Sequence, residues 1–466
     1  MKVIGDPTRA LTSGLAAIRR EFAVPQGFPP EVLAAAEAAT RRAPQEHADR
    51  TAQRFVTLDP ASSTDLDQAF AIERSGTDLL LHYAIADVAW FVDDGDPIDV
   101  EAWRRGATQY LPDGKAGLYP PVLGEGAASL LPKSPRPAVV FVVRVDQDGE
   151  VLLDAVDRAV IRSSAKLAYD SVLAADLPPD FAELAERVRG AEDRRGAARL
   201  DPPEQEVATL GNGRYQLTFR QRLLSEDQNA ALSLATNLAV ADLLQKAGTG
   251  LFRVMPGPDA HAVERLRQTA RAFDLIWPDM ATLDQFEKTL DPVNPRAAAF
   301  MMAARRAGGG ASYVPYREGE VPWHAPMAAT YAHATAPLRR LADRYVLRAA
   351  LAVANGRPVP AAVTDAFARL PAVMARADMI GGRIERAVVD LAELVMLQGH
   401  EGEIFAAVAT DIDERGVRIQ LRDLPVAARA DAAGVAPGDD LNVRLVACDL
   451  ERRTVRFERV VSAIRR

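Results

Sequence analysis

The sequence predicts an α+β protein, in which a region of strands is followed by a region of helices and then by a small all-β module. From about residue 54, segments rich in β-branched and aromatic residues are broken by Gly, Asp and Pro, which favours a mostly antiparallel sheet. After about residue 225, apolar residues recur at three-and-four spacing, which is typical of packed helices. Short strand-like segments return near residue 402 and indicate a closed barrel.

Composition limits the classes of protein that fit. With 466 residues, 48% of them hydrophobic and 26% charged, the chain suits a folded main domain with a smaller module. A single cysteine, Cys448, and no N-terminal export signal argue against a disulfide scaffold and favour a cytoplasmic enzyme. The longest apolar stretches, such as residues 138–145, are far shorter than the roughly 20 residues that a membrane-spanning helix needs. A net charge of -8 argues against a wholly basic nucleic-acid binder but leaves a local basic groove open.

Residues 1–50 form a helical N-terminal region. The segments 8–22 and 29–43 carry apolar residues at helical spacing, and a short turn joins them. Such a pair is either half of a helix-turn-helix-like unit or a helical lead-in that packs on the main domain, and the sequence leaves both readings open.

The sheet and the helices that follow can be placed by residue number. The expected strands are residues 54–59, 68–74, 79–92, 138–145 and 151–162. The expected helices are residues 226–248, 259–275, 338–356 and 366–397. From residue 402 onward, several short strands with turns at "DERG" and "PGDD" suit a small barrel of the OB type, in which Cys448 is expected to be an inert core residue.

The stretch "VTLDPASSTDLDQAF", residues 56–70, holds three carboxylates in an otherwise apolar setting. If Asp65 and Asp67 open a strand they share one face, and Asp59 can fold back onto that face across a short loop. Carboxylates this close take up protons or bind cations, and oxygen ligands suit hard divalent ions such as Mg²⁺. The alternative is that these aspartates merely cap a turn.

A second constellation lies in "YAHATAPLRRLADRY", residues 331–345. A helix is expected to start near Pro337, which would place Arg339 and Arg340 in its first turn. The helix dipole disfavours cations there, so the two arginines indicate a bound anion such as phosphate, which a guanidinium clasps with two hydrogen bonds. A solvated pair of charges with Asp343 as ion-pair partner is an equally good reading.

Together, "TLDPASSTDLDQAF" and "YAHATAPLRRLAD" resemble the signature pair of the RNB catalytic domain, which ribonuclease II and ribonuclease R share. "HYAIADVAWFV" (82–92), "QYLPDG" (109–114) and "SLLPKSPRPAVVFVVRVD" (129–146) extend the resemblance in the same order. It implies an RNB domain over residues 51–398, followed by an S1-type RNA-binding barrel over residues 399–466.

This resemblance implies a processive 3′-to-5′ exoribonuclease that hydrolyses single-stranded RNA to nucleoside 5′-monophosphates, in RNA decay or 3′-end trimming. It implies that Asp59, Asp65 and Asp67 hold two Mg²⁺ ions, with Mn²⁺ as the alternative, and that Asp67 matters most for the chemical step. The further roles it implies are a phosphate contact for Arg339 with its neighbour Arg340, base stacking for Tyr110, and closure of the pocket by Glu385. His333, beside the arginines, either contacts phosphate or is a structural histidine. The partner is then single-stranded RNA, with no membrane and no nucleotide cofactor, and the family suggests a monomer.

The chain also departs from the family pattern. Gln68 stands where a fourth aspartate is usual; its amide oxygen could still be a metal ligand, but the missing charge should weaken the second ion. Leu200 occupies the place of an aromatic clamp, and Ala336 replaces a serine. The first 50 residues are too few and too helical for the usual cold-shock domains, so we expect a shortened RNA funnel that trims overhangs closer to a duplex. An RNA-binding or RNA-processing factor with a weakened nuclease site is the alternative function.

Overall fold

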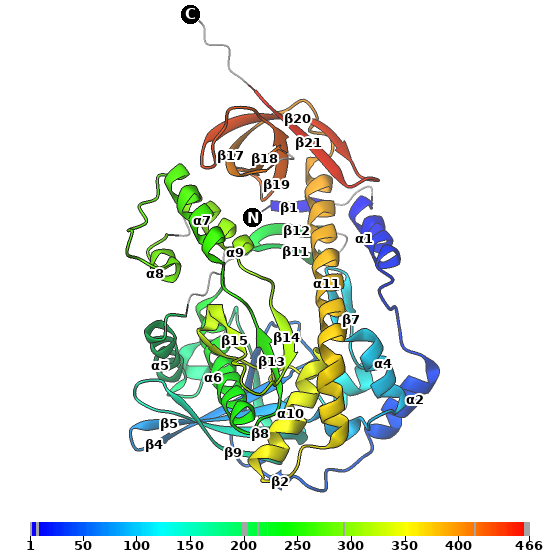
Figure 1. Ribbon diagram of the computed structural model, residues 1–466. Helices are drawn as coiled ribbons and strands as arrows, with labels where there is room; N and C mark the ends of the chain where they lie inside the picture. The colour runs from blue at the N-terminus through cyan, green and yellow to red at the C-terminus, as the bar shows by residue number, and fades with distance from the viewer. Residues whose placement is uncertain are drawn as a thin grey trace, which may run out of the picture.

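A computed structural model describes residues 2–5, 9–197, 204–211, 214–220, 222–291, 294–413 and 416–460, and Figure 1 shows its arrangement. A seven-stranded sheet lies at its base, in the order β10-β3-β4-β5-β8-β9-β2. The strands are β2 (Ala48–Asp49), β3 (Phe55–Asp59), β4 (Gln68–Ser75), β5 (Asp78–Ala86), β8 (Arg136–Val145), β9 (Val151–Ile161) and β10 (Ser163–Ala168). Neighbours are antiparallel except at the two edges, where β10 runs parallel to β3 and β2 parallel to β9. The predicted, mostly antiparallel sheet is confirmed.

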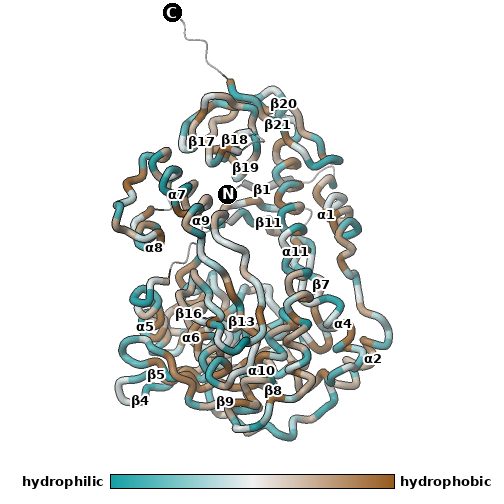
Figure 2. Tube along the Cα trace, in the orientation of Figure 1, coloured by the Kyte–Doolittle hydropathy of each residue, from teal (hydrophilic) through white to brown (hydrophobic). Residues whose placement is uncertain are grey.

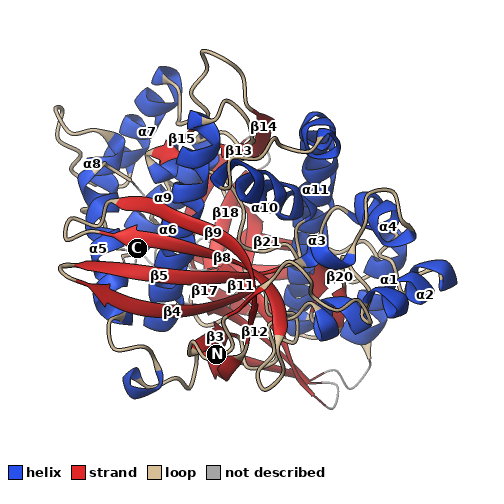
Figure 3. Cartoon of the chain, turned by 90° about the horizontal axis from the view of Figure 1, so that it is seen from below, coloured by secondary structure: helices blue, strands red, loops and turns tan. Residues whose placement is uncertain are grey.

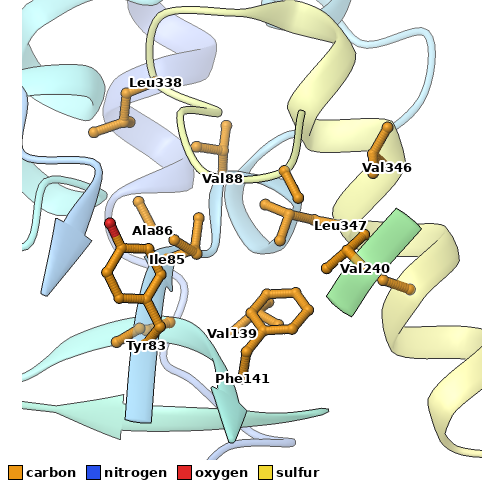
Figure 4. Packing of buried hydrophobic residues seen from close by; sticks show 14 of the residues in the cluster. Tyr83, Ile85, Ala86, Val88, Val139, Phe141, Val240, Leu338, Val346 and Leu347 are labelled. Atoms are coloured by element: carbon orange, nitrogen blue, oxygen red, sulfur yellow. The ribbon is translucent and has the colours of Figure 1, made fainter. Parts of the chain in front are cut away.

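Helices cover one face of this sheet. They are α5 (Phe181–Arg194), α6 (Leu224–Lys246) and α10 (Leu341–Ala354); in Figure 3 the strands β8 and β9 lie in front of α6, and α10 lies beside β9. Figure 4 shows side chains from β5, β8, α6 and α10 packed together, among them Phe141, Val240 and Leu347. Figure 2 shows the same lower body rich in hydrophobic residues. Burial of this apolar surface is the main force that fixes the sheet under the helices.

The long helix α11 (Ala361–Leu397) connects the lower body to the C-terminal barrel (Figure 1). Along it packs α1 (Ala10–Glu21), whose Gly14 approaches so closely that an added Cβ would lie 2.4 Å from Leu391 Cδ2. The second N-terminal helix, α2 (Pro30–Ala39), packs instead on α4 (Pro97–Arg105). Both helices therefore lie on the main body, as in the lead-in reading of residues 1–50.

Smaller elements complete the body. One small sheet contains β1 (Lys2–Gly5), β11 (Glu204–Gly211) and β12 (Arg214–Arg220). A helical group consists of α7 (Ala260–Ala272), α8 (Leu283–Glu287) and α9 (Pro295–Ala307). Three strand pairs are β6 (Gln109–Leu111) with β7 (Gly114–Ala116), β13 (Leu251–Val254) with β14 (Ser312–Pro315), and β15 (Trp323–His324) with β16 (Ala329–Thr330). One expected strand, residues 79–92, is shorter than predicted. It ends at Ala86, because a short helix, α3 (Val88–Phe91), begins directly after it. The Asp87 side chain caps this helix by accepting a hydrogen bond from the N–H of Trp90.

The C-terminal segment is a closed five-stranded barrel, as predicted. Its strands are β17 (Ile404–Asp413), β18 (Gly416–Leu421), β19 (Ala427–Asp431), β20 (Asp440–Asp449) and β21 (Thr454–Arg459). Cys448 lies half-buried in β20, and its thiol donates to the carbonyl oxygen of Leu394 at 3.3 Å. Over the stretches that the structure describes, none of the helices has the length and apolar character needed to cross a membrane.

Candidate active site

The carboxylates of residues 56–70 lie where β3 ends and before β4 begins. Asp59 is the last residue of β3, whereas Asp65 and Asp67 lie in the extended segment ahead of Gln68, the first residue of β4. From the sequence, we expected Asp65 and Asp67 to open this strand. Instead, the backbone from Thr64 to Asp67 bonds to neighbouring segments, with the Ser129 hydroxyl donating to the Thr64 carbonyl and the N–H of Ala86 donating to the Asp67 carbonyl.

Asp67 is the most enclosed of the three carboxylates, with 5% of its surface exposed. Its Oδ1 accepts a hydrogen bond from the N–H of Leu338 at 2.7 Å, and its Oδ2 lies 3.3 Å from Nε of Arg339. Burial raises the pKa of Asp67 to about 7, against the opposing effects of Arg339 and the Leu338 N–H. The arginine segment therefore meets the aspartate segment at Asp67, as both sequence motifs require.

Asp59 lies near the same arginine. Burial raises the pKa of Asp59 to about 6; Asp65 adds to the shift, whereas Arg339 and Lys166 oppose it. Its Oδ2 is buried and has no hydrogen-bond partner among the residues that the structure describes. We call Asp59, Asp67 and Arg339 the inner side of the site.

Asp65 faces a different part of the molecule. Lys115 Nζ donates to its Oδ1 at 2.6 Å, and the Tyr110 hydroxyl donates to its Oδ2 at 3.3 Å. Tyr110 and Lys115 are cross-strand partners in the β6–β7 hairpin, so both side chains leave the hairpin together toward Asp65. The Tyr110 side chain is exposed, with 54% of its surface open to solvent. We call Asp65, Tyr110 and Lys115 the outer side of the site.

Gln68 is held by two hydrogen bonds. Its Nε2 donates to the carbonyl oxygen of Thr335 at 2.6 Å, and its Oε1 accepts from the hydroxyl of Tyr83 at 2.7 Å. Tyr83 is fully buried, and Figure 4 shows its hydroxyl oxygen at the edge of the apolar cluster. Gln68 thus joins the sheet to the segment that precedes Arg339, and the amide oxygen considered as a metal ligand already has a protein donor.

The arginine segment is a turn, not the first turn of a helix. The predicted helix start near Pro337 is wrong, because α10 begins at Leu341. Upstream of it the backbone bonds across to the chain before β6: the N–H of Thr108 donates to the Arg339 carbonyl at 3.0 Å, and the N–H of Leu341 donates to the Gly106 carbonyl at 3.0 Å. These long-range bonds compete successfully with the helix that Pro337 favours.

The two arginines of this turn have different environments. Arg340 forms a bidentate ion pair with Asp343, with distances of 2.9 Å from Nε to Oδ2 and 2.7 Å from Nη2 to Oδ1. Asp343 is fully buried, so Arg340 serves as its counter-charge; the expected pairing with Asp343 is present, but the pair is buried and not solvated. Arg339 is the arginine that reaches the carboxylates, and 46% of its side chain remains exposed.

The other predicted site residues lie at varied positions. His333 Nδ1 bonds to the Tyr313 hydroxyl at 2.7 Å, and burial together with the charges of nearby arginines holds the pKa of His333 well below its usual range. It is therefore a neutral, packed histidine. Glu385 is exposed on α11, one turn beyond Gly381, which packs on Gln109 of β6. Leu200 lies outside the described residues.

The donor set can be tested against a metal ion. Of the residues with assigned positions, no three His, Cys, Asp or Glu side chains are grouped so that they could hold one. Asp59 and Asp67 nevertheless suit a hard divalent cation, because both offer oxygen donors in a buried setting, and Oδ2 of Asp59 has no hydrogen-bond partner among the described residues. The inner side fits one such ion, and Asp65 is engaged by Lys115.

Sequence reasoning missed Lys115. The signal was present, since "LPDG" (residues 111–114) is a turn sequence that makes residues 110 and 115 partners in a hairpin. The bonds that hold Gln68 had no local signal, because they reach Tyr83 in the next strand and Thr335 on a distant segment.

Comparisons with known proteins agree with this architecture. The RNB domain model matches residues 48–355, and the model for the RNase II-type exonuclease C-terminal S1 domain matches residues 403–460. Ribonuclease R of Aquifex aeolicus is 26% identical over 98% of this chain and 72% of its own length. Exoribonuclease 2 of Serratia proteamaculans is 27% identical over 84% of this chain and 63% of its own length. The chain thus matches only part of each relative.

Solved structures of low identity share the fold. Mycoplasma genitalium RNase R in complex with ribose-methylated single-stranded RNA superimposes with a TM-score of 0.86 at 20% identity, over 97% of this chain and 78% of the other. Yeast Ssd1, described as a pseudonuclease, superimposes with a TM-score of 0.68 at 15% identity, over 93% of this chain and 57% of the other. Both an RNase R and a pseudonuclease therefore have this architecture.

Proposed function

The chain belongs to the RNB family, whose domain model covers more than half of it, and from this membership we propose that it is a divalent-metal-dependent 3′-to-5′ exoribonuclease. Its relatives named ribonuclease R and exoribonuclease 2 support a nuclease. In the proposed reaction the enzyme moves processively along single-stranded RNA and releases nucleoside 5′-monophosphates, in RNA decay or in 3′-end trimming.

One observation carries the proposal. The fold brings Asp67 into contact with Leu338 and Arg339, residues 271 and 272 positions further along the chain. Asp67, a buried carboxylate, contacts the half-exposed guanidinium of Arg339, and the charge of Arg339 also acts on the carboxylate of Asp59. That combination suits a phosphodiester, because the carboxylates can hold a cation and the guanidinium can bind the phosphoryl oxygens.

In this proposal, the residues of the inner side have two separate roles, metal binding and stabilisation of negative charge. Asp59 and Asp67 would hold the ion, Mg²⁺ or Mn²⁺, which when bound supplies Lewis-acid activation of water and of the scissile phosphate. Arg339 would offset the charge that develops on the phosphoryl oxygens, since its guanidinium is permanently charged. The expected second ion would need Asp65 or Gln68 as a ligand, and protein groups engage both side chains.

The outer side would bind the RNA. The exposed ring of Tyr110 is available to stack on a base near the 3′ end, and Glu385 on α11 would close the pocket. Preference for RNA over DNA would come from contacts to the 2′-hydroxyl. We propose that the chain acts as a monomer in the cytoplasm.

The second candidate is an RNA-binding or RNA-processing factor with a weakened nuclease site. Gln68 favours it, because a neutral amide stands where the family resemblance implies a carboxylate. The likeness to a pseudonuclease fold is compatible with it. Against it, Asp59, Asp67 and Arg339 are present and assembled.

The test is the shortening of a single-stranded RNA labelled at its 5′ end, with Mg²⁺ or Mn²⁺ present. We expect full-length RNA to be converted to a short labelled end product with few intermediates, as processive digestion from the 3′ end produces, and a rate about 10²-fold to 10³-fold lower for Asp67→Asn, as for the loss of a central charge-stabilising group. Asp242→Asn is the matched control, because Asp242 is an exposed aspartate on α6 that pairs with Lys246, and it should leave the rate unchanged. RNA binding without any release by the wild-type chain would instead favour the second candidate.

A further inference from the structure

The ammonium of Lys115 is fixed between two carboxylates. Its Nζ lies 2.6 Å from Asp65 Oδ1 and 3.3 Å from Glu125 Oε1. Glu125 is held in turn by Thr64, whose hydroxyl donates to Oε2 at 2.6 Å. The Lys115 side chain is mostly buried, with 21% of it exposed. The Lys115 ammonium therefore occupies the position beside Asp65 where a metal cation would otherwise neutralise that carboxylate.

The hairpin that carries Lys115 is fastened to the body. Its tip residue Asp113 accepts two hydrogen bonds from Arg19 on α1, at 2.7 Å from Nη2 and 3.1 Å from Nε. Arg19 also donates to the Gly114 carbonyl at 3.0 Å. On the other strand, the Gln109 amide donates to the Ala377 carbonyl of α11 at 3.4 Å. Both strands are thus tied to helices, which keeps Lys115 close to Asp65.

Gln68 removes the other ligand that a second ion would use. It carries no charge, and both of its polar atoms are bonded, to Tyr83 and to Thr335. For Gln68 Oε1 to point into the site, the amide would have to give up its hydrogen bond from the buried Tyr83 hydroxyl. The protein therefore stabilises Gln68 in a position that does not serve a metal ion.

The charges of these side chains balance with one divalent ion. Asp59, Asp65, Asp67 and Glu125 carry four negative charges, and Arg339 and Lys115 supply two positive ones, so two positive charges are missing. We propose that the site binds a single divalent cation, at Asp59 and Asp67, and that Lys115 supplies at Asp65 the positive charge that a second cation would supply. This inference rests on the proposed nuclease function. An ammonium donates hydrogen bonds but is no Lewis acid, so Lys115 would bind a phosphate oxygen without activating water.

The test counts Mn²⁺ ions bound per full chain, by titration calorimetry and by electron paramagnetic resonance of the free ion. Neither measurement needs turnover. We expect one ion for the wild-type chain and for Lys115→Arg, which keeps the charge. Lys115→Ala should gain a second, weaker ion, and in Lys115→Ala combined with Gln68→Asp that ion should bind at least ten-fold more tightly. Lys246→Ala, which removes an exposed lysine of α6, is the matched control and should still bind one ion.

Two tightly bound ions in the wild-type chain would overturn the proposal. So would a count of one in the double variant when its circular dichroism and unfolding temperature match the wild type. If Lys115→Ala fails to fold, Lys115→Gln gives the same comparison with a side chain of similar size. The proposed function fails separately, when the wild-type chain binds one ion and releases no nucleotide.

Discussion

Asp67 is held by a backbone N–H and a guanidinium from a turn that is itself bonded to distant segments, whereas Asp65 is held by two side chains of one short hairpin. The inner side of the site is therefore part of the core. Thr335, three residues before the Leu338 N–H, bonds to Gln68 and to Ser233 of α6. The outer side depends on the β6–β7 hairpin, which carries Tyr110 and Lys115. In the proposed function, the inner side would perform the chemistry, which tolerates least displacement, and the outer side, held by the hairpin, would position the RNA.

The largest expected effect separates the two arginines of the turn. Arg339→Ala should reduce nucleotide release about 10²-fold or more and should destabilise the chain less than Arg340→Ala, because Arg339 is half-exposed and, in the proposed function, acts on the phosphate. Arg340→Ala should instead lower the free energy of unfolding by about 3 kcal/mol or more, because it leaves the buried Asp343 without its counter-charge. Rates and urea unfolding of both variants make the comparison. Equal losses of stability would show that both arginines are structural.

Next in size is the pH dependence of the metal-free chain. The folded-state pKa values of Asp59 and Asp67, about 6 and about 7, lie above the unfolded value of 3.8, so the folded chain holds protons that the unfolded chain has released. Stability should therefore fall as pH rises from about 4 to 7, by up to about 1.4 kcal/mol per pH unit for each group that titrates.

Thermal unfolding between pH 4 and 8 without divalent ions measures this slope. Asp67→Asn should flatten its upper part, and addition of Mg²⁺ at pH 8 should restore stability, because the ion replaces the lost protons. A wild-type chain that gains stability from pH 5 to 7 would contradict the assignment of an inner side short of counter-charge.

The smallest expected effect concerns the outer side. Tyr110→Ala should weaken the binding of a short single strand by about 1 to 3 kcal/mol, the contribution of stacking one base, whereas Tyr110→Phe keeps the ring and should change binding by less than about 1 kcal/mol. Fluorescence anisotropy with a labelled strand and Ca²⁺ in place of Mg²⁺ measures both. If Phe is as damaging as Ala, the hydroxyl bond to Asp65 matters and stacking does not.

Much of this molecule could be predicted from the sequence where a pattern is local. The strands at residues 54–59, 138–145 and 151–162 are confirmed because β-branched residues alternate or run together there, and the barrel is confirmed by its short strands and turns. The edge strand β10 was missed, because "SSAKLA" has little strand propensity and is fixed by its parallel pairing with β3.

The individual residues of the site could be predicted from the sequence, but the contacts between distant segments that hold them could not. The three aspartates and Arg339 stand out by charge in apolar surroundings, and the structure brings Asp67 and Arg339 together. The start of α10 was misplaced, since the bonds from residues 106–108 that end the turn come from far away in the sequence. The same reason hides the role of Gln68, whose partner Thr335 lies 267 residues away.

Arg19 on α1 reaches the tip of the hairpin that presents Tyr110 and Lys115. Similarity to the RNB domain begins at residue 48, so a fragment cut there would keep every carboxylate and lose this clamp. It would also lose Leu11, Leu15 and Ile18, which pack with α11. For protein engineering, the shortest version of this chain that keeps the hairpin clamped must therefore include α1, because α1 packs on α11 although it lies outside the match to the RNB domain.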